Sequence, residues 1–317
     1  MKKLVAIITV LAMVLTLGTW ALAEQDYSDI NVKVALITMD SMSSHWVHVK
    51  EGAEAALARY AEQGASIEMS WLSPEQKDNS QQIQKIEAAV ADGVNYIIIA
   101  ANDPSACNRA LEEAIAAGIK LIYVDSPATV PAEVCYATNN YGGGVTAGEY
   151  LKKALDDAGI TEGTIGIVDA QAGVQSCQDR YDGFASVFEG TGFVLSERQY
   201  SDGDELKALE LGTALLNNGA VALYGTNDAA TVGAASAAAE VIANGQNVPV
   251  VGWDNTPSNI AHVENGELLA FMAQNPYDMG VDAIDAVVAL TRGESLNGES
   301  VDTGVSTVDA SNVAEFK

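Results

Sequence analysis

The chain has 317 residues, in which 43 Asp and Glu side chains outnumber 16 Lys and Arg side chains and give a formal net charge of −27. Nucleic acids and anionic membrane surfaces attract basic proteins, so this acidic balance argues against both as partners. The length is ample for two domains.

The N-terminal residues predict export. A positive pair that ends at Lys3 precedes an almost unbroken apolar stretch, 4–17, and small residues follow at Ala21 and Ala23, the positions that a signal peptidase reads. The apolar stretch is shorter than the roughly 20 residues that span a bilayer, which favours a signal peptide over a membrane anchor. We predict cleavage after Ala23, so that the signal peptide is 1–23 and the exported, periplasmic or extracellular chain starts at Glu24. No cysteine closely follows the apolar stretch, so no lipid anchor is expected.

Short strand-like runs alternate with helix-like segments from residue 32 onward. Runs rich in Val, Ile and Leu that stop at turn residues are typical of strands buried on both faces. The predicted strands are 32–39, 67–72, 96–101, 120–124, 135–138, 164–168, 193–200, 220–226, 248–253 and 268–273. The predicted helices are 46–63, 80–91, a segment with Pro104 in its first turn, 144–158, 175–189, 204–217, 229–243 and 276–290.

Helices of this length between short buried strands imply parallel crossover connections, which predicts the α/β class. The pattern restarts after the glycine cluster at 142–144, so we predict two doubly wound parallel sheets, one in each domain. The cluster lacks both glycine orders that cradle phosphates, and we interpret it as a helix start that needs close packing. The loops are short and no low-complexity linker separates the halves, so the domains are expected to share several chain crossings.

Four of the predicted strands each stop on one polar residue. These residues are Asp125, Asn227, Asp254 and Gln274. Ligands of open α/β sheets bind just outside the carboxyl ends of the strands, so this set predicts a pocket for a small polar molecule. A single Asp or Asn after a strand is more often a helix cap or a turn former. That interpretation is stronger for Asp40, Asn102 and Asp169, which also end strands.

Aromatic side chains accompany these polar residues. Trp253 directly precedes Asp254, and His45 and Trp46 open the first predicted helix. An aromatic ring beside carboxylates and amides suits a sugar, because the C–H face of the sugar packs on the ring while its hydroxyls form charge-assisted hydrogen bonds.

The sequence offers no catalytic or metal-binding constellation. None of His45, His48 and His262 comes with a nucleophile in a known motif, and Gly-x-Ser-x-Gly, CxxC, HExxH and Cys/His clusters are absent. We therefore expect no enzyme, no bound metal and no cofactor.

Three cysteines, an odd number, cannot all pair within one chain. Cys107 falls near the start of a helix, hence near the carboxyl edge of the sheet, whereas Cys135 begins a strand near the opposite edge. A bridge between them is geometrically awkward, so we predict that both of these and Cys177 are buried free thiols.

Short motifs along essentially the whole mature chain resemble the ribose-binding-protein branch of the periplasmic sugar-binding proteins. Each motif is weak alone, but their order and spacing together are specific. The motifs are Val34-Ala-Leu-Ile, Gly52-Ala, Val124-Asp125, Ala137-Thr-Asn-Asn with Gly144 and Gly148, Arg180-x-x-Gly-Phe184, Thr226-Asn-Asp228, Val251-Gly-Trp-Asp-Asn-Thr-Pro257 and Ala273-Gln274.

The resemblance implies a monomeric exported receptor that captures a monosaccharide or related polyol and hands it to a membrane ABC-type permease. Two lobes of the periplasmic-binding-protein-like I fold would close over the ligand about a three-strand hinge. The N-terminal lobe would hold 24–138 and 275–304, with helix 276–290 packed on it, and the C-terminal lobe would hold 139–274 and 305–317.

The resemblance also implies residue roles. Trp46 and Trp253 match positions where aromatic rings sandwich the sugar, His45 stands where a second aromatic residue of the first helix is usual, and Ser43 stands where an amide or carboxylate is usual. The predicted ligand-binding residues are Asp40, Ser43, His45, Trp46, Asp125, Ser126, Gln178, Asn227, Trp253, Asp254 and Gln274.

Two positions depart from the pattern of ribose binders. Ser126 stands where these proteins carry an Arg after the residue matching Asp125, and Gln178 stands where they carry another Arg. The loss of both guanidinium groups removes bidentate donors that an amide does not reproduce. We therefore expect ribose to bind poorly and a hexose or an inositol to bind better.

Other functions remain open in the binding class. One is a receptor for a non-sugar, such as a nucleoside or a sugar-like signal molecule, and another is delivery of the ligand to a chemoreceptor or sensor kinase. A transcription repressor with the same ligand-binding core is opposed by the signal peptide and by the absence of a basic helix-turn-helix before Val32.

Overall fold

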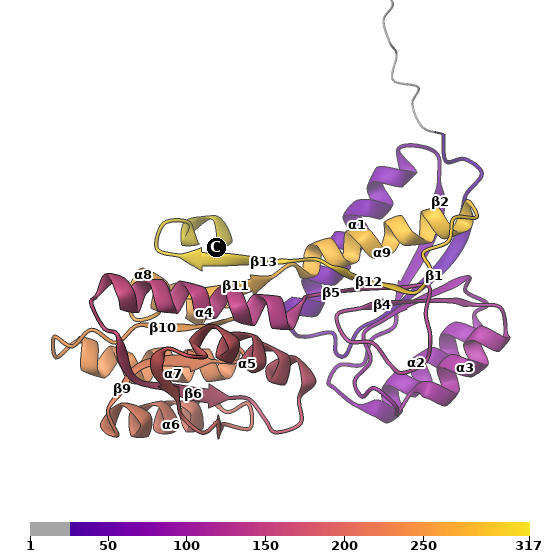
Figure 1. Ribbon diagram of the computed structural model, residues 1–317. Helices are drawn as coiled ribbons and strands as arrows, with labels where there is room; N and C mark the ends of the chain where they lie inside the picture. The colour runs from indigo at the N-terminus through magenta and orange to yellow at the C-terminus, as the bar shows by residue number, and fades with distance from the viewer. Residues whose placement is uncertain (1–25) are drawn as a thin grey trace, which may run out of the picture.

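The computed structural model describes residues 26–317, and two α/β lobes account for them (Figure 1). The predicted signal peptide, 1–23, and its cleavage after Ala23 lie outside the described residues. Within 26–317, no helix combines the length and the apolarity that crossing a bilayer requires.

Each lobe is built around one sheet. The strands are β1 (Asn31–Ile37), β2 (Ser66–Trp71), β3 (Tyr96–Ile99), β4 (Lys120–Val124), β5 (Val134–Ala137), β6 (Glu162–Asp169), β7 (Gly192–Leu195), β8 (Gln199–Tyr200), β9 (Ala220–Gly225), β10 (Val250–Trp253), β11 (Ala270–Gln274), β12 (Glu299–Asp302) and β13 (Val305–Asp309). The helices are α1 (Ser44–Ala61), α2 (Asn79–Ala91), α3 (Asn108–Ala116), α4 (Asn140–Asp157), α5 (Gln175–Phe188), α6 (Glu205–Asn217), α7 (Asp228–Ile242), α8 (Pro257–Glu264), α9 (Pro276–Thr291) and the short 3₁₀ helix η1 (Val313–Phe316).

The two sheets have matching strand orders. The N-terminal lobe holds a six-stranded sheet in the order β12-β5-β4-β3-β1-β2, whose neighbours are all parallel. The C-terminal lobe holds a seven-stranded sheet in the order β13-β11-β10-β9-β6-β7, with β8 paired to β6 and only β13 antiparallel to its neighbour. The predicted α/β class with two doubly wound, mainly parallel sheets is confirmed.

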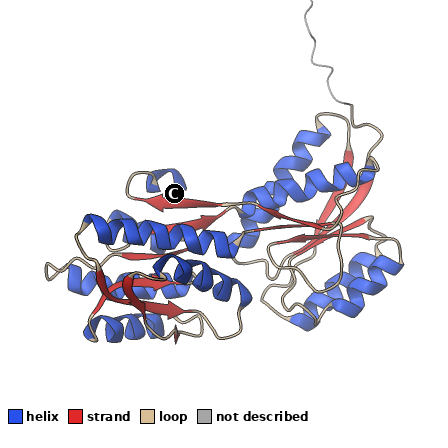
Figure 2. Cartoon of the chain, viewed as in Figure 1, coloured by secondary structure: helices blue, strands red, loops and turns tan. Residues whose placement is uncertain are grey.

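Helices cover both faces of each sheet, as Figure 2 shows in blue against red strands. Successive strand residues point to opposite faces, and β1 illustrates the consequence. Val34 and Leu36 pack in a core with α1 and α9, whereas Ala35 and Ile37 pack in a second core with α2 and α3. Strands buried on both sides therefore read as continuous apolar runs, which is why the sequence located most of them.

Glycines allow two pairs of helices to cross closely. A Cβ atom on Gly280 of α9 would lie 1.9 Å from the carbonyl oxygen of Val49 in α1. A Cβ atom on Gly144 of α4 would lie 2.1 Å from the carbonyl oxygen of Arg180 in α5. The prediction that the glycine cluster serves close packing is confirmed, but the helix begins at Asn140 rather than at residue 144.

Two local predictions were wrong for identifiable reasons. The predicted strand 193–200 is split into β7 and β8, because the hydroxyl of Ser196 accepts the Ile167 amide at 3.0 Å where the ladder would continue. Pro104 does not lie in a helix, because the carboxylate of Asp103 accepts the amides of Ser105 and Ala106 and forms a turn that delays α3.

The chain passes between the two sheets at three places, after β5, after β11 and between β12 and β13 (Figure 1). The three connections are bonded to one another: the Asn139 amide donates to Asp302 at 2.9 Å, and the Asn275 side chain donates to the Thr303 carbonyl at 2.7 Å. The lobe boundaries predicted from the sequence fall in these connections, and we keep them as a proposal.

All three cysteines are free thiols, as predicted. Cys107 and Cys177 are buried, and Cys135 is only partly buried.

Candidate functional site

Asp125 follows β4 at the carboxyl edge of the N-terminal sheet in a left-handed conformation, with φ of 59°. Asp and Asn accept this conformation more readily than most residues. The Asp125 amide donates to the Tyr136 carbonyl of the neighbouring strand at 2.7 Å. Its carboxylate accepts the Ser126 hydroxyl at 2.5 Å and lies 3.5 Å from Nε2 of His45.

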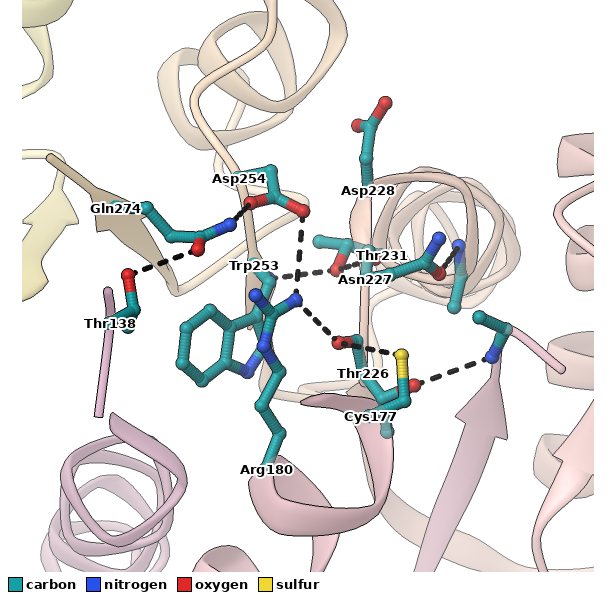
Figure 3. Close-up of polar contacts among 12 residues, drawn as sticks. Thr138, Cys177, Arg180, Thr226, Asn227, Asp228, Thr231, Trp253, Asp254 and Gln274 are labelled. Atoms are coloured by element: carbon teal, nitrogen blue, oxygen red, sulfur yellow. Dashed lines mark hydrogen bonds and ion pairs between the residues drawn. The ribbon is translucent and has the colours of Figure 1, made fainter. Parts of the chain in front are cut away.

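Asp254 follows β10 in the C-terminal sheet with the same backbone conformation, φ of 76°. Its amide donates to the Met272 carbonyl of the neighbouring strand at 3.0 Å. One carboxylate oxygen accepts Nε2 of Gln274 at 2.7 Å, and the other lies 3.8 Å from Nη1 of Arg180 (Figure 3).

Arg180 is a charged residue of the site that the sequence analysis listed only as part of a motif. It projects from α5 and is 5% exposed. Its guanidinium donates to Asn140 at 2.8 Å. It also donates to the Thr226 carbonyl at 3.1 Å and stacks 3.8 Å from the centre of the Trp253 ring (Figure 3). The available signal was an arginine at helical spacing from Cys177, Phe184 and Phe188, on the buried face of α5.

Gln274 connects the site to a chain crossing. Its Oε1 accepts the hydroxyl of Thr138, which directly follows β5, at 3.0 Å, while its Nε2 donates to Asp254 (Figure 3). A polar chain therefore runs from Thr138 in the first crossing through Gln274 and Asp254 to Arg180.

Trp253 does not take the place predicted for it. The ring is fully buried, its Nε1 donates to the Tyr224 hydroxyl at 2.8 Å, and a Cβ on Gly143 would overlap it. The prediction that this ring packs on a sugar was wrong, because its neighbour Asp254 turns toward the edge while the indole enters the core. It acts instead as the surface on which Arg180 lies.

His45 and Trp46 do come together at the edge of the N-terminal lobe. Their rings meet edge to face with centroids 4.6 Å apart, Trp46 is largely buried, and the His45 side chain is 22% exposed. Nε2 of His45 is buried and makes no hydrogen bond to any described residue.

The turn that enters α1 uses Asp40 as a backbone acceptor. Its Oδ1 accepts the amides of Met42 at 2.9 Å and Ser43 at 2.7 Å. Ser43 is exposed and its side chain forms no cap. Both predicted residues therefore lie beside His45 in the chain, and the turn-forming role of Asp40 is the one that the structure has.

Asn227 and Asn102 follow equivalent strands but differ in their bonding. Oδ1 of Asn227 caps α7 by accepting the Ala230 amide at 3.1 Å. Asn102 is 8% exposed, and both polar atoms of its side chain lack a partner in the described part of the chain. The capping interpretation of Asn102 was wrong, because a turn separates it from α3. It lies close to Ser126, whose carbonyl accepts the Ala101 amide at 2.7 Å.

Gln178 lies in a network that the sequence analysis missed. Its Oε1 accepts a guanidinium N–H of Arg198, and its Nε2 donates to Asp182 at 2.8 Å. Arg198 also pairs with Asp169, which is fully buried and further accepts the Thr226 hydroxyl at 2.5 Å. The buried carboxylate of Asp169 thus has a cation, rather than serving as the cap that the sequence suggested.

The two carboxyl edges lie within electrostatic reach of each other. Burial alone would raise the pKa of Asp125, but His45, the Ser126 hydroxyl and the charge of Arg180 outweigh it and lower that pKa below its usual value. Arg180 belongs to the other lobe, so Asp125 and the Arg180–Asp254 pair face a shared region. Near them, burial raises the pKa of Asp228 to about 6, and Asp254 and Glu205 add to the rise against the Thr256 hydroxyl.

A pocket of about 360 Å³ lies beside the crossings and contains none of the predicted ligand-binding residues. It is lined by Ala137, Thr138, Asn139, Asn140, Tyr141, Asp179, Ser300 and Asp302. Among residues 26–317, no group of three or more His, Cys, Asp or Glu side chains could hold a metal ion.

Residues 34–295 match the model of the periplasmic binding protein domain. The chain is 25% identical to the ribose import binding protein RbsB of Escherichia coli (strain K12), over 94% of this chain and 96% of that protein. It is 29% identical to the D-allose-binding periplasmic protein of the same organism, over 86% and 87% of the two chains. The fold is similar to that of a sugar-binding protein of a sugar ABC transporter from Bacillus halodurans, with a TM-score of 0.81, 24% identity and coverage of 90% of this chain and all of the other.

Proposed function

The chain belongs to the periplasmic binding protein domain family, and from this premise we propose that it captures a monosaccharide or related polyol between its lobes for uptake. The observation that carries the proposal is that each of the two facing edges holds one strand-end aspartate. Asp125 offers a carboxylate from one lobe, and Asp254 offers a carboxylate from the opposite lobe. Carboxylates that accept hydroxyls form charge-assisted hydrogen bonds, which suit a ligand with hydroxyls on several sides.

Unsatisfied polar groups support the same proposal. The amide of Asn102 and Nε2 of His45 are buried without partners in the described residues. A buried polar group without a hydrogen bond carries a penalty of about 1–3 kcal/mol, which a bound polyol would relieve. We propose Asp125, His45, Asn102, Asn227 and Asp254 as groups that contact the ligand, with Trp46 as the aromatic surface.

Gln274 offers a route from ligand binding to lobe closure. It holds Asp254 with its amide nitrogen and the hinge residue Thr138 with its carbonyl oxygen. A ligand that draws Asp254 toward the N-terminal lobe would act on the crossing through this one side chain. Ligands shift such an equilibrium only by their differential affinity for the two states.

The partners follow from the family. The relatives include proteins named for ribose import and for sugar ABC transport, and we propose that this chain delivers its ligand to a membrane ABC permease as a monomer and does not catalyse a reaction. Delivery to a chemoreceptor or sensor kinase is a further proposal. N-terminal sequencing of exported protein tests cleavage after Ala23, and light scattering tests the monomer.

A thermal-shift screen against pentoses, hexoses, inositols and nucleosides tests the function. A ligand that binds only the folded state stabilises it by RT ln(1 + [L]/Kd), about 4 kcal/mol at roughly a thousandfold excess over Kd. A pentose, hexose or inositol should raise the melting temperature. A response to nucleosides alone would favour the non-sugar receptor, and no response to any compound would contradict the proposal.

The departures at Ser126 and Gln178 predict weak ribose binding. The Ser126 hydroxyl already donates to Asp125. The side chain of Gln178 already donates to Asp182 and accepts from Arg198, both in its own lobe. Calorimetric titration with ribose and with a panel of hexoses and inositols checks this expectation. Sub-micromolar ribose binding that no other polyol matches would contradict it.

A further inference from the structure

Asp125 differs from Asp254 and Asp169, because its one ion-pair partner among the described residues is an imidazole rather than a guanidinium. Asp254 has Arg180 at 3.8 Å and the amide of Gln274 at 2.7 Å. Asp169 is paired with Arg198. Asp125 accepts the Ser126 hydroxyl at 2.5 Å and lies 3.5 Å from Nε2 of His45, a group that is cationic only when the imidazole is protonated.

The remaining carboxylates of this region are compensated in other ways. Asp40 accepts two backbone amides. Asp228 accepts the Thr256 hydroxyl at 3.0 Å and the Asn259 amide at 3.3 Å. Buried charges in proteins are normally paired. Asp125 has one ion-pair partner among the described residues, the imidazole of His45, so a cationic group of the ligand would complement it.

Arg180 cannot easily serve as that cation. Its guanidinium is held by Asn140, the Thr226 carbonyl and the Trp253 ring, all within the C-terminal lobe, in addition to Asp254. Its charge reaches Asp125 only at long range. Moving it to Asp125 would leave Asp254 with the neutral Gln274 alone.

The free hydrogen-bonding groups of the site also favour a ligand group that donates. Ser126 and Gln178 offer a hydroxyl and an amide in place of guanidinium donors. The Ser126 hydroxyl already donates to Asp125, and Nε2 of Gln178 already donates to Asp182. Acceptors remain on Asp125, on the outer oxygen of Asp254 and on Oδ1 of Asn102. A ligand group with several N–H donors suits these acceptors, and an ammonium group has three. Nδ2 of Asn102 is left to donate to a ligand hydroxyl.

We infer that the preferred ligand is a polyol that carries a protonated amine, such as an amino sugar or an amino cyclitol, with its ammonium group beside Asp125. The inference rests on the proposed function and narrows its substrate class. The ammonium group donates to the Asp125 carboxylate and places a positive charge beside it. The hydroxyls of the ligand are left to Asp254, Asn227 and Asn102.

The test uses matched sets of ligands with the full mature chain. Glucosamine, galactosamine, mannosamine and an inosamine are each compared by calorimetry with the parent hydroxyl compound and with the N-acetyl derivative, at about pH 6, where such amines are protonated. At least one amine should bind at least about tenfold more tightly than its parent, as expected for a hydrogen bond between charged groups. Acetylation, which removes the charge, should abolish the gain.

Two variants locate the amine. Asp125→Asn keeps a residue that accepts the left-handed backbone and should lower amine affinity at least about tenfold while changing parent affinity less. Ser126→Arg should shift preference toward the neutral parent, because it supplies the cation within the protein. Asp103→Asn, a carboxylate of the same lobe that only forms a turn, is the matched control and should retain the amine preference.

The outcomes separate this inference from the proposed function. If neutral polyols bind as tightly as their amines, or if Asp125→Asn keeps the amine preference, the inference is overturned and sugar capture stands. If neither amines nor neutral polyols bind, both are overturned. If Ser126→Arg does not fold, Asp125→Asn and the acetylated ligands still decide the question.

Discussion

The carboxyl edges of the two sheets use one backbone arrangement for two different chemistries. Strands β4 and β10 occupy the same third place in sheets of matching order. Each is followed by an aspartate in the left-handed conformation whose amide donates to the next strand, at 2.7 Å for Asp125 and 3.0 Å for Asp254. The C-terminal edge pairs Asp254 and Asp169 with arginines, whereas Asp125 at the N-terminal edge has a hydroxyl and an imidazole. The fold therefore fixes where a carboxylate stands, and its neighbours decide whether the protein or the ligand balances its charge.

The largest expected effect on stability comes from removing the Arg198–Asp169 ion pair at the C-terminal edge. Arg198→Met leaves the fully buried Asp169 without its cation, and removing one partner of a buried ion pair lowers the free energy of unfolding by about 3–5 kcal/mol. Urea unfolding measures the loss. The double variant Arg198→Met/Asp169→Asn should recover most of it, and a single variant as stable as wild type would show that the pair carries little.

The next comparison replaces the two equivalent aspartates with asparagine, which accepts the left-handed backbone. Both Asp125→Asn and Asp254→Asn should weaken ligand binding by a hundredfold or so, since truncating a buried charge-assisted bond removes about 2–5 kcal/mol. Asp254→Asn should destabilise the free protein more than Asp125→Asn does, because it leaves the guanidinium of Arg180 without its carboxylate, whereas Asp125→Asn removes contacts with an imidazole and a hydroxyl. Calorimetry and melting temperatures together check both parts. Equal melting temperatures for the two variants would contradict the distinction between the edges.

Close helix crossings give a test in which the lobes should behave alike. Gly280→Ala in the N-terminal lobe and Gly144→Ala in the C-terminal lobe place a Cβ atom 1.9 and 2.1 Å from backbone oxygens. Overpacking of this kind lowers the free energy of unfolding by about 1–3 kcal/mol or more. Gly142→Ala is the milder comparison, because its new Cβ would meet the side chain of Asn139, the N-cap of α4, rather than the backbone of another helix. The free energy of unfolding is measured with denaturant. If it is the same for all three variants and wild type, the helices do not cross as closely as described.

The smallest effect concerns pH and Asp228. Its pKa in the folded protein is raised to about 6, above the value near 3.9 of an unfolded chain. The folded state therefore binds the proton more tightly, and the contribution of this group to stability rises as pH falls from about 7 to about 4. Asp228→Asn should raise the melting temperature at neutral pH and flatten this part of the profile relative to wild type. A parallel pair of profiles would show that Asp228 is not the group responsible.

The sequence was most informative where a local pattern decides the structure. The predicted strand 120–124 coincides with β4, because the run is apolar, buried on both faces and closed by Asp125. The strand 193–200 was predicted as one element, because only the tertiary structure brings the Ser196 hydroxyl to the Ile167 amide.

The same limit applies to the site. The sequence located the strand-end residues Asp125, Asp254 and Gln274 by their place after apolar runs, and their contact with a ligand remains a prediction. It missed the roles of Arg180 and Arg198, because their carboxylate partners follow other strands far along the chain. It misplaced Trp253, because adjacency to Asp254 does not tell which of two alternating side chains enters the core.

The contact of α9 with α1 also bears on the order in which the two lobes can be completed. Helix α9 completes the core of the N-terminal lobe, with Gly280 seated against the backbone of Val49, yet it follows β6 to β11 of the other lobe in the chain. A polypeptide delivered from its N-terminus thus exposes the apolar face of α1 until nearly all of the second sheet has been delivered. Contacts this distant in sequence form slowly, so the first lobe to emerge is the last to be completed.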